Sequence, residues 1–363
     1  MCPSNRRLGA AVSARLAHDE QLDSSEHTLH PGQVPRASSK DAERHTLARP
    51  IFDNRITRLL GVEIPIANSP MGFVADAEFV AGVAEVGAIG LLPGSVGTQA
   101  TREGIHRIRE RTSRSFGVNL PIAYVKDVSI LDMLVEEGIE FVTTSAGPPD
   151  AYTSRLKNAG LKVLHVVTSL ESAKHAVDAG VDGLVAEGIE GAGLKGHREV
   201  STMVLVPLIA SHVDVPVIVA GGIADGASMA AAFALGAEGV QMGTRMLASI
   251  ESHVHQNLKQ AVVAAAETDT VLLNRHNGRP MRVLRTKTTA ALECATDGDP
   301  VRDLMPAVRM TYEQGVIEGS IPSVGQVAGR IESLLPVAEI IGRTVREFGE
   351  VIQRLAADHL RSS

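Results

Sequence analysis

The sequence predicts an α/β protein in which short parallel strands alternate with helices. A repeated pattern carries this prediction, because amphipathic stretches end in a glycine and a short apolar run follows almost at once. A glycine after a helix suits a left-handed C-cap. Short runs rich in Val, Ile and Leu are typical of strands buried on both faces of a parallel sheet. The pattern recurs at Gly87, Gly138, Gly160, Gly180 and Gly236.

The number of strands predicts how the sheet is arranged. Gly138 and Gly160 lie 22 residues apart, and Gly160 and Gly180 lie 20 apart, which leaves room for one strand and one helix in each unit. Eight such units predict a TIM barrel. A doubly wound open sheet is the alternative, weakened because no GxGxxG motif follows the first strand. The eight strand candidates are Pro65–Met71, Ala88–Pro93, Ser115–Leu120, Phe141–Ser145, Lys162–Val167, Gly183–Gly188, Pro216–Gly222 and Gly239–Thr244.

Polar residues mark where the helices of these units begin. Asp76 and Asp225 each precede an apolar or alanine-rich stretch, as N-cap residues do. Thr168 is followed three residues later by Glu171, which is the pattern of a capping box. We therefore expect helix starts at these three positions.

Changes in composition along the chain predict four segments. Residues 1–49 mix Ser, Pro, His and both charges without periodicity, so we expect a disordered or loosely packed tail. Residues 50–248 form the predicted barrel. Residues 249–323 are expected to form a lid or small helical domain, and residues 324–363 to form closing helices.

Composition excludes several classes of protein. The chain has 363 residues, of which only 3% are aromatic, and a net charge of -7 without basic clusters, so a nucleic-acid surface is not expected. No apolar run approaches the roughly 18 residues of a membrane span. The absence of a signal-peptide pattern predicts a cytoplasmic location. We expect no metal site, and base rates favour a homodimer.

Glycines at the ends of two neighbouring strands predict a phosphate site. In TIM barrels the active site lies at the carboxyl ends of the strands, and phosphate commonly binds after strands seven and eight. The seventh strand ends in Gly221 and Gly222, and the eighth in Gly243 and Thr244. Glycines let backbone N–H groups approach an anion, and a threonine adds a hydroxyl donor.

Two polar residues at other strand ends are further candidates. Asn119 ends the third strand, where a buried amide needs a partner that either a ligand or a loop backbone could supply. Glu187 ends the sixth strand, where a buried carboxylate also needs a partner. A role in the site and a structural hydrogen bond are equally compatible with Glu187.

Several motifs in order give the chain a family resemblance. It resembles the nitronate monooxygenases, and their relatives the FMN-dependent enoyl-acyl-carrier-protein reductases, over roughly residues 50–355. The motifs are SPMG (69–72), GVNLP (117–121), AEGIEGAG (186–193), VIVAGGI (217–223), GVQMGTRMLAS (239–249), ETDTVL (267–272), GRPMR (278–282) and GSIPSVGQVAGRI (319–331).

The resemblance implies a TIM barrel that binds one non-covalent FMN. By matched position, its phosphate would lie on Gly221, Gly222, Gly243 and Thr244, with Gln241 and Met242 in the same segment. The flavin ring would lie near Met71 and Asn119. The substrate side would be lined by Glu187, Ala192 and Gly193.

One departure from the family bears on the chemistry. Family members usually carry a histidine, the proton-transfer residue, at the position of Leu194. His197 follows three residues later and is our candidate catalytic residue, although a solvated loop histidine fits that position equally well. Some relatives carry a lysine where this chain has Val166. The neighbouring His165 is typical of a structural strand histidine.

The resemblance implies oxidation of an alkyl nitronate or related nitro compound by O2, giving a carbonyl compound and nitrite. Because Leu194 cannot take up a proton, neutral nitroalkanes should react poorly, while Lys195 and Arg198 could attract an anion at the mouth. One alternative is an NAD(P)H-dependent FMN reductase acting on an enoyl thioester or a quinone. Another is a flavin-binding protein that has lost catalysis. Inosine monophosphate dehydrogenase is set aside, because it needs a nucleophilic cysteine in the loop directly after the sixth strand, and neither Cys2 nor Cys294 lies there.

Overall fold

The structure is a computed structural model that describes residues 51–196 and 198–359. The expected N-terminal tail, residues 1–49, and the candidate His197 therefore lie outside the described residues. No helix in the described part of the chain is long and apolar enough to cross a membrane.

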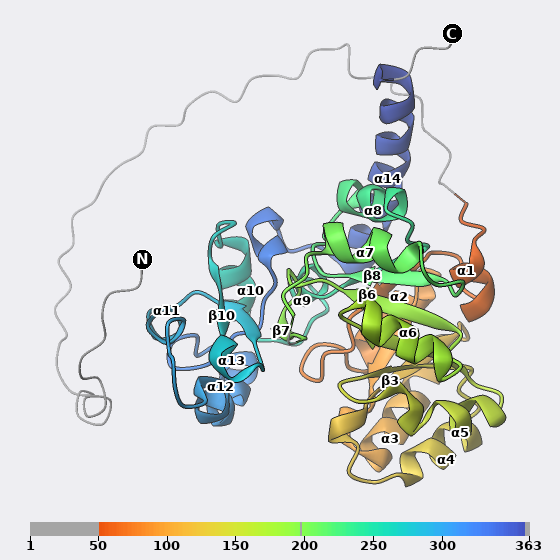
Figure 1. Ribbon diagram of the computed structural model, residues 1–363, viewed down its shortest axis with the longest axis horizontal. Coiled ribbons are helices and arrows are strands. Elements are labelled where there is room, and N and C mark those ends of the chain that lie inside the picture. Colours follow the sequence, from red (N-terminus) through yellow and green to blue (C-terminus); the bar gives the residue numbers. More distant parts are fainter. Residues whose placement is uncertain (1–50, 197, 360–363) are drawn as a thin grey trace, which may run out of the picture. The chain divides into compact units, whose positions relative to one another are not determined.

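Eight parallel strands form one sheet that curves into a barrel, as Figure 1 shows. Their order in the sheet is β1-β9-β8-β6-β5-β4-β3-β2. All eight predicted strands are present, and the predicted TIM barrel is confirmed. The strands are β1 (Ile66–Asn68), β2 (Gly90–Pro93), β3 (Phe116–Pro121), β4 (Phe141–Ser145), β5 (Lys162–Val167), β6 (Gly183–Glu187), β8 (Val217–Ala220) and β9 (Gly239–Met242).

The barrel closes between its first two strands. Ala67 in β1 forms a parallel bridge with Ile89, which directly precedes β2. The buried side chain of Asn68 continues this pairing, since its Oδ1 accepts from the Leu91 amide at 2.8 Å. Its Nδ2 donates to the Leu91 carbonyl at 3.0 Å. A side-chain amide thus supplies the hydrogen bonds that a further strand residue would make.

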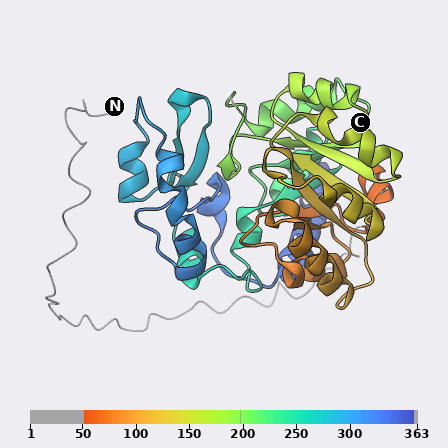
Figure 2. The same cartoon turned by 90° about the horizontal axis from the view of Figure 1, so that it is seen from below.

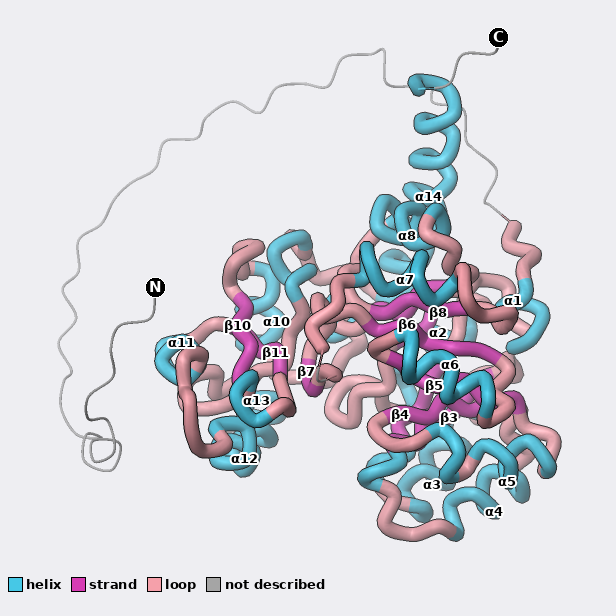
Figure 3. Tube along the Cα trace, in the orientation of Figure 1, coloured by secondary structure: helices cyan, strands magenta, loops and turns pink. Residues whose placement is uncertain are grey.

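Helices surround the barrel, as Figure 3 shows. The five glycines of the repeat have positive φ angles, between 61° at Gly138 and 101° at Gly236, as the left-handed C-caps require. The barrel segment contains α1 (Arg55–Leu60), α2 (Ala77–Glu85), α3 (Thr98–Arg109), α4 (Ser129–Glu136), α5 (Thr153–Asn158), α6 (Leu170–Asp178), α7 (Thr202–Ala210), α8 (Gly226–Ala234) and α9 (Thr244–Leu247).

The helix caps match two of the three predictions. Asp76 accepts from the Phe79 amide at the start of α2, and Asp225 accepts from the Ser228 amide at the start of α8. The predicted start at Thr168 is wrong by one residue. Ser169 is the N-cap of α6 and forms the capping box with its own N3 residue, not with Glu171.

Two apolar layers hold the barrel together. The larger layer lies between the strands and the helices, and the smaller fills the barrel interior with side chains such as Phe141, Leu164 and Ile218. Ile56 and Leu60 of α1 belong to the interior layer and lie at the end where the strands begin. The opposite end, where the strands finish, is therefore the open one.

The chain after the barrel contains strands as well as helices. A small antiparallel sheet joins β10 (Thr270–Leu273), β11 (Met281–Leu284) and β7 (Gly193–Leu194), in the order β10-β11-β7. Figure 2 shows cyan and blue segments of this part of the chain to the left of the barrel. Around it lie α10 (Gln256–Val263), α11 (Lys287–Leu292), α12 (Pro300–Leu304) and α13 (Val308–Gln314). The sequence predicted a lid or small helical domain here. It did not reveal these strands, because each has at most four residues and β7 is distant in sequence from its partner β11.

The end of the described chain is one long helix, α14 (Val337–His359). It packs against α8, where Phe348 contacts Phe233 and the Glu347 carboxylate accepts from the Gly226 amide at 3.1 Å. The closing helices predicted over residues 324–363 are therefore present only in part, since before α14 only residues 326–330 are helical, as a short 3-10 helix.

Candidate functional site

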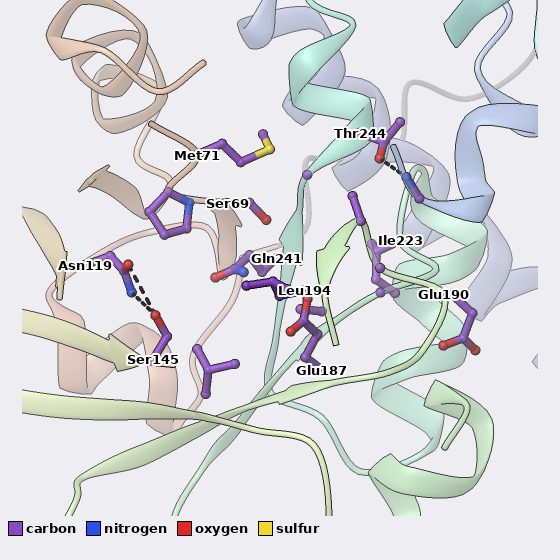
Figure 4. A pocket seen from close by; sticks show the side chains of 18 of the residues that line it. Ser69, Met71, Asn119, Ser145, Glu187, Glu190, Leu194, Ile223, Gln241 and Thr244 are labelled. Carbon is purple, nitrogen blue, oxygen red and sulfur yellow. Dashed lines mark hydrogen bonds between the residues drawn. The ribbon is translucent and has the colours of Figure 1, made fainter. Parts of the chain in front are cut away.

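A cavity of about 510 Å³ opens at the carboxyl ends of the barrel strands. Figure 4 shows side chains from several strands surrounding it. Most residues that the sequence analysis proposed line this cavity. They are Met71, Asn119, Glu187, Ala192, Gly221, Gly222, Gln241, Gly243 and Thr244.

The other proposed residues lie elsewhere. Met242 is buried in the layer between strands and helices, because alternate residues of β9 point to opposite faces. Gly193 pairs with Arg282 in the small sheet and is not among the residues that line the cavity. His197 lies outside the described residues.

The glycine turns after β8 and β9 present their backbone to the cavity. Gly221 and Gly222 have φ angles of 90° and 82°, which only glycine adopts without strain. A Cβ atom on Gly221 would lie 2.9 Å from the Gly188 carbonyl oxygen. Within the described residues, the amides of Gly222, Gly243 and Thr244 donate to no backbone carbonyl. These N–H groups are therefore available to an anion such as a phosphate.

Thr244 adds a hydroxyl group to this candidate anion site. Its Oγ1 accepts from the Gly325 amide at 2.8 Å, which leaves its hydroxyl proton free to point at a ligand. Gly325 belongs to the chain after the barrel, and a Cβ atom there would lie 2.8 Å from the Glu190 carbonyl oxygen. Gly325 also lines the cavity. The sequence motif contained this glycine, but only the fold reveals how close it lies to Thr244.

Asn119 has its partners within the barrel. Its Nδ2 donates to Thr143 Oγ1 at 2.9 Å, and its Oδ1 accepts from Ser145 Oγ at 3.5 Å. Both partners lie on the neighbouring strand β4, so neither a ligand nor a loop backbone is needed to satisfy this buried amide. The side chain is thus held rigidly at the cavity wall.

Glu187 has a buried cation as its partner. The Lys195 ammonium forms an ion pair with Glu187 Oε1, and the lysine side chain is only 2% exposed. The Lys195 amide also donates to the Pro280 carbonyl at 2.8 Å, which fixes the backbone at this point. Glu187 therefore both lines the cavity and makes a structural ion pair.

The predicted attraction of anions by Lys195 and Arg198 is not supported by these contacts. The Lys195 ammonium points at Glu187. Arg198 and Glu171 of α6 are both exposed, and Arg198 Nη2 lies 3.6 Å from Glu171 Oε2. The sequence could not show which carboxylate each cation would meet. We infer that neither ammonium nor guanidinium is free at the mouth.

The second carboxylate of the cavity is fully engaged. Both oxygens of Glu190 accept from the Thr202 amide, at 2.9 and 3.0 Å, and one also accepts from the Thr202 hydroxyl. Glu190 thereby holds the first residue of α7 and is not placed to exchange a proton with a ligand. The sequence did not single it out.

Among the described residues, no histidine lines the cavity. Leu194 does line it, and is 39% exposed. Val166 of β5 lines it as well, while the adjacent His165 is buried and lies 2.7 Å from Thr144 Oγ1 through its Nδ1. Burial lowers the pKa of His165 to about 4. His165 is a structural histidine, and the cavity wall beside it is apolar.

The features together define a class of protein: a parallel α/β barrel with a candidate anion site, made of backbone amides, at one side of its cavity. The nitronate monooxygenase family model matches residues 53–124 and 122–347, so the chain belongs to the nitronate monooxygenase family. It is a flavin-dependent oxidoreductase of that family.

Three similar proteins illustrate the range of the family. FabK from Thermotoga maritima is 38% identical with a TM-score of 0.80, over 84% of this chain and 99% of that one. A nitroalkane oxidase from Streptomyces ansochromogenes is 26% identical with a TM-score of 0.74, over 83% of this chain and 100% of that one. A Rhodococcus jostii dehydrogenase of a 5-hydroxy-7a-methyl-1-oxo-octahydro-1H-indene-4-carboxyl-CoA is 34% identical, over 70% of this chain and 71% of that one.

Proposed function

We propose that this protein is an FMN-dependent enzyme that oxidises a pre-formed alkyl nitronate with O2 to a carbonyl compound and nitrite. One observation carries the choice of a nitronate: the cavity presents Leu194 where the family usually presents a histidine. A leucine cannot remove the proton of a neutral nitroalkane. A nitronate is already deprotonated and needs no base.

The residues around the cavity fit FMN. The free amides of Gly222, Gly243 and Thr244 would hold its phosphate, and Met71 and Val166 would contact the flavin ring. Bound FMN would supply the two-electron oxidation. The few aromatic residues of the chain imply a ring held by aliphatic, Met and backbone groups.

The chain's own residues would bind and orient the substrate. Leu194 and Val166 offer an apolar surface to the alkyl group and exclude water from it. Lys195 neutralises Glu187, so this carboxylate repels an anionic substrate less than a free one would. His197 stays our proposed proton-transfer residue for any step that needs one, because it follows Leu194 by three positions.

An anaerobic reduction test checks this proposal. Ethyl nitronate should bleach the flavin of the purified protein at least tenfold faster than the same concentration of neutral nitroethane, and nitrite should form when air is admitted. Comparable rates with the two compounds would contradict the proposal.

A second candidate substrate is an acyl thioester of coenzyme A. It is favoured by two relatives, from Rhodococcus jostii and Mycobacterium tuberculosis, which are dehydrogenases of a coenzyme A thioester and are 34% and 33% identical to this chain. In the same anaerobic test, bleaching by NADH or NADPH, followed by reoxidation with an enoyl-CoA, would support this candidate. Bleaching by nitronate alone would exclude it.

A further inference from the structure

A second cavity, of about 400 Å³, lies behind the predicted phosphate site. Residues that directly follow the two glycine turns line it, namely Ala224 and Asp225 after β8 and Arg245 after Thr244. The other side is formed by the loop around Ser333 and by Arg343 of α14. Adjacent residues of one turn thus face two different cavities.

Arg245 is a buried cation without a counter-charge. It is 7% exposed, and its Nη2 donates to the carbonyl oxygens of Ala248 and Ser333, at 2.6 and 2.7 Å. Its Nε has no hydrogen-bond partner within the described residues. No carboxylate of the described residues lies within ion-pair distance of its guanidinium. A buried charge left in this state is costly.

A second guanidinium increases the positive charge at this place. Arg343 lines the same cavity. Its Nε donates a hydrogen bond to Glu339 Oε1 at 2.7 Å. Burial, and then the charge of Arg343, lower the pKa of Arg245 to about 10, so Arg245 stays a cation at neutral pH. Arg245 and Arg343 line one cavity, and none of the three carboxylates that also line it forms an ion pair with either guanidinium. This arrangement favours a bridging anion.

The acidic residues of the cavity are engaged elsewhere. Asp225 caps α8 and forms an ion pair with Arg330, and Glu347 accepts from the Gly226 amide. Glu332 is exposed. None of the three forms an ion pair with Arg245.

The geometry points to an oxyanion site between Arg245 and Arg343, and we assign to it a phosphate group. A guanidinium pair binds the oxygens of a phosphate through several charge-assisted hydrogen bonds. The phosphate could be inorganic or belong to a nucleotide. Because Arg245 directly follows Thr244, an anion here would order α9 and strengthen FMN binding at the first site, and FMN would strengthen anion binding equally.

Calorimetric titration of the FMN-saturated protein tests this assignment. Inorganic phosphate and AMP are the two probes, with sodium chloride of equal ionic strength as the blank. We expect saturable binding of at least one probe, and tighter binding of AMP would identify a nucleotide phosphate as the ligand. Arg343→Gln should weaken binding at least fivefold.

A matched variant on the same helix serves as the control. Arg346 is similarly exposed and contacts the same Glu339, at 3.5 Å, but does not line the cavity. Arg346→Gln should therefore leave binding unchanged. Equal losses in the two variants, or no binding of either probe by the unmodified protein, would overturn the assignment. Arg343 is partly exposed, so its variant is expected to fold even if an Arg245 variant does not.

Discussion

At the scale of single residues, the chemistry depends on Leu194. Its backbone is fixed by pairing with Met281 of β11, and its side chain reaches the cavity. We predict that Leu194→His adds a base that titrates near neutral pH. Turnover of neutral nitroethane, measured as nitrite formed at pH 8, should rise about tenfold or more, within the range that general-base catalysis gives.

A control for this variant is available on α7. Leu208 is also 39% exposed but lies outside the cavity, so Leu208→His adds an equally exposed histidine in the wrong place. It should leave nitroethane turnover unchanged. If Leu194→His folds, binds FMN and still gains no nitroethane activity, then more than the missing histidine restricts the substrate.

The side chains that meet around the cavity were only partly predictable. The glycines, Asn119 and Glu187 could be found because strand ends gather at one end of a parallel barrel. The residues that pair with Glu187 and Asn119 could not be predicted. Lys195 meets Glu187 because the chain turns between β6 and β7, and Thr143 meets Asn119 through the register of β3 and β4. Neither relation leaves a pattern in the local sequence.

At the scale of elements, the turn after β8 is the most sensitive part of the predicted FMN site. Gly222 has a left-handed backbone, and an added Cβ would meet no atom closer than 3.9 Å. Gly222→Ala therefore costs about 1–2 kcal/mol of conformational strain without a clash. The turn would relieve this strain by moving its amide, so we predict about tenfold weaker FMN binding, measured by flavin fluorescence.

A glycine in α2 provides the comparison. Gly82 lies within the helix, and an added Cβ there would meet no atom within 4 Å. Because alanine favours helix by about 1 kcal/mol over glycine, Gly82→Ala should keep or raise stability and leave FMN binding unchanged. If Gly222→Ala binds FMN as strongly as the unmodified protein does, this turn does not hold the phosphate.

The elements were predictable wherever one local pattern decided them. The eight barrel strands and the glycine caps are read from short apolar runs and single residues, and all are present. The hairpin of β10 and β11 was missed because Asn274 and Gly278, both with positive φ, turn the chain inside what resembles one irregular loop. Its buried side chains, such as Val271 and Val283, pack mainly with each other.

At the scale of the whole molecule, one buried histidine links folding to pH. His165 is 3% exposed between a strand and the helix layer, where His175 also disfavours its charge. Its pKa is about 4 in the folded protein, against 6.5 for the free side chain. The unfolded chain therefore binds more protons than the folded one between these values, and stability falls as the pH falls from about 6.5 to about 4.

The expected loss of unfolding free energy over this range is about 3 kcal/mol, since one pKa unit corresponds to about 1.4 kcal/mol. His165→Gln keeps a partner for Thr144 Oγ1 but cannot take up a proton. Urea unfolding at fixed FMN concentration, repeated between pH 7 and pH 4, should therefore show a shallower decline for this variant. His212→Gln, which changes an exposed histidine bonded to the Leu208 carbonyl, should keep the original slope. Identical slopes for His165→Gln and the unmodified protein would show that other groups cause its acid sensitivity.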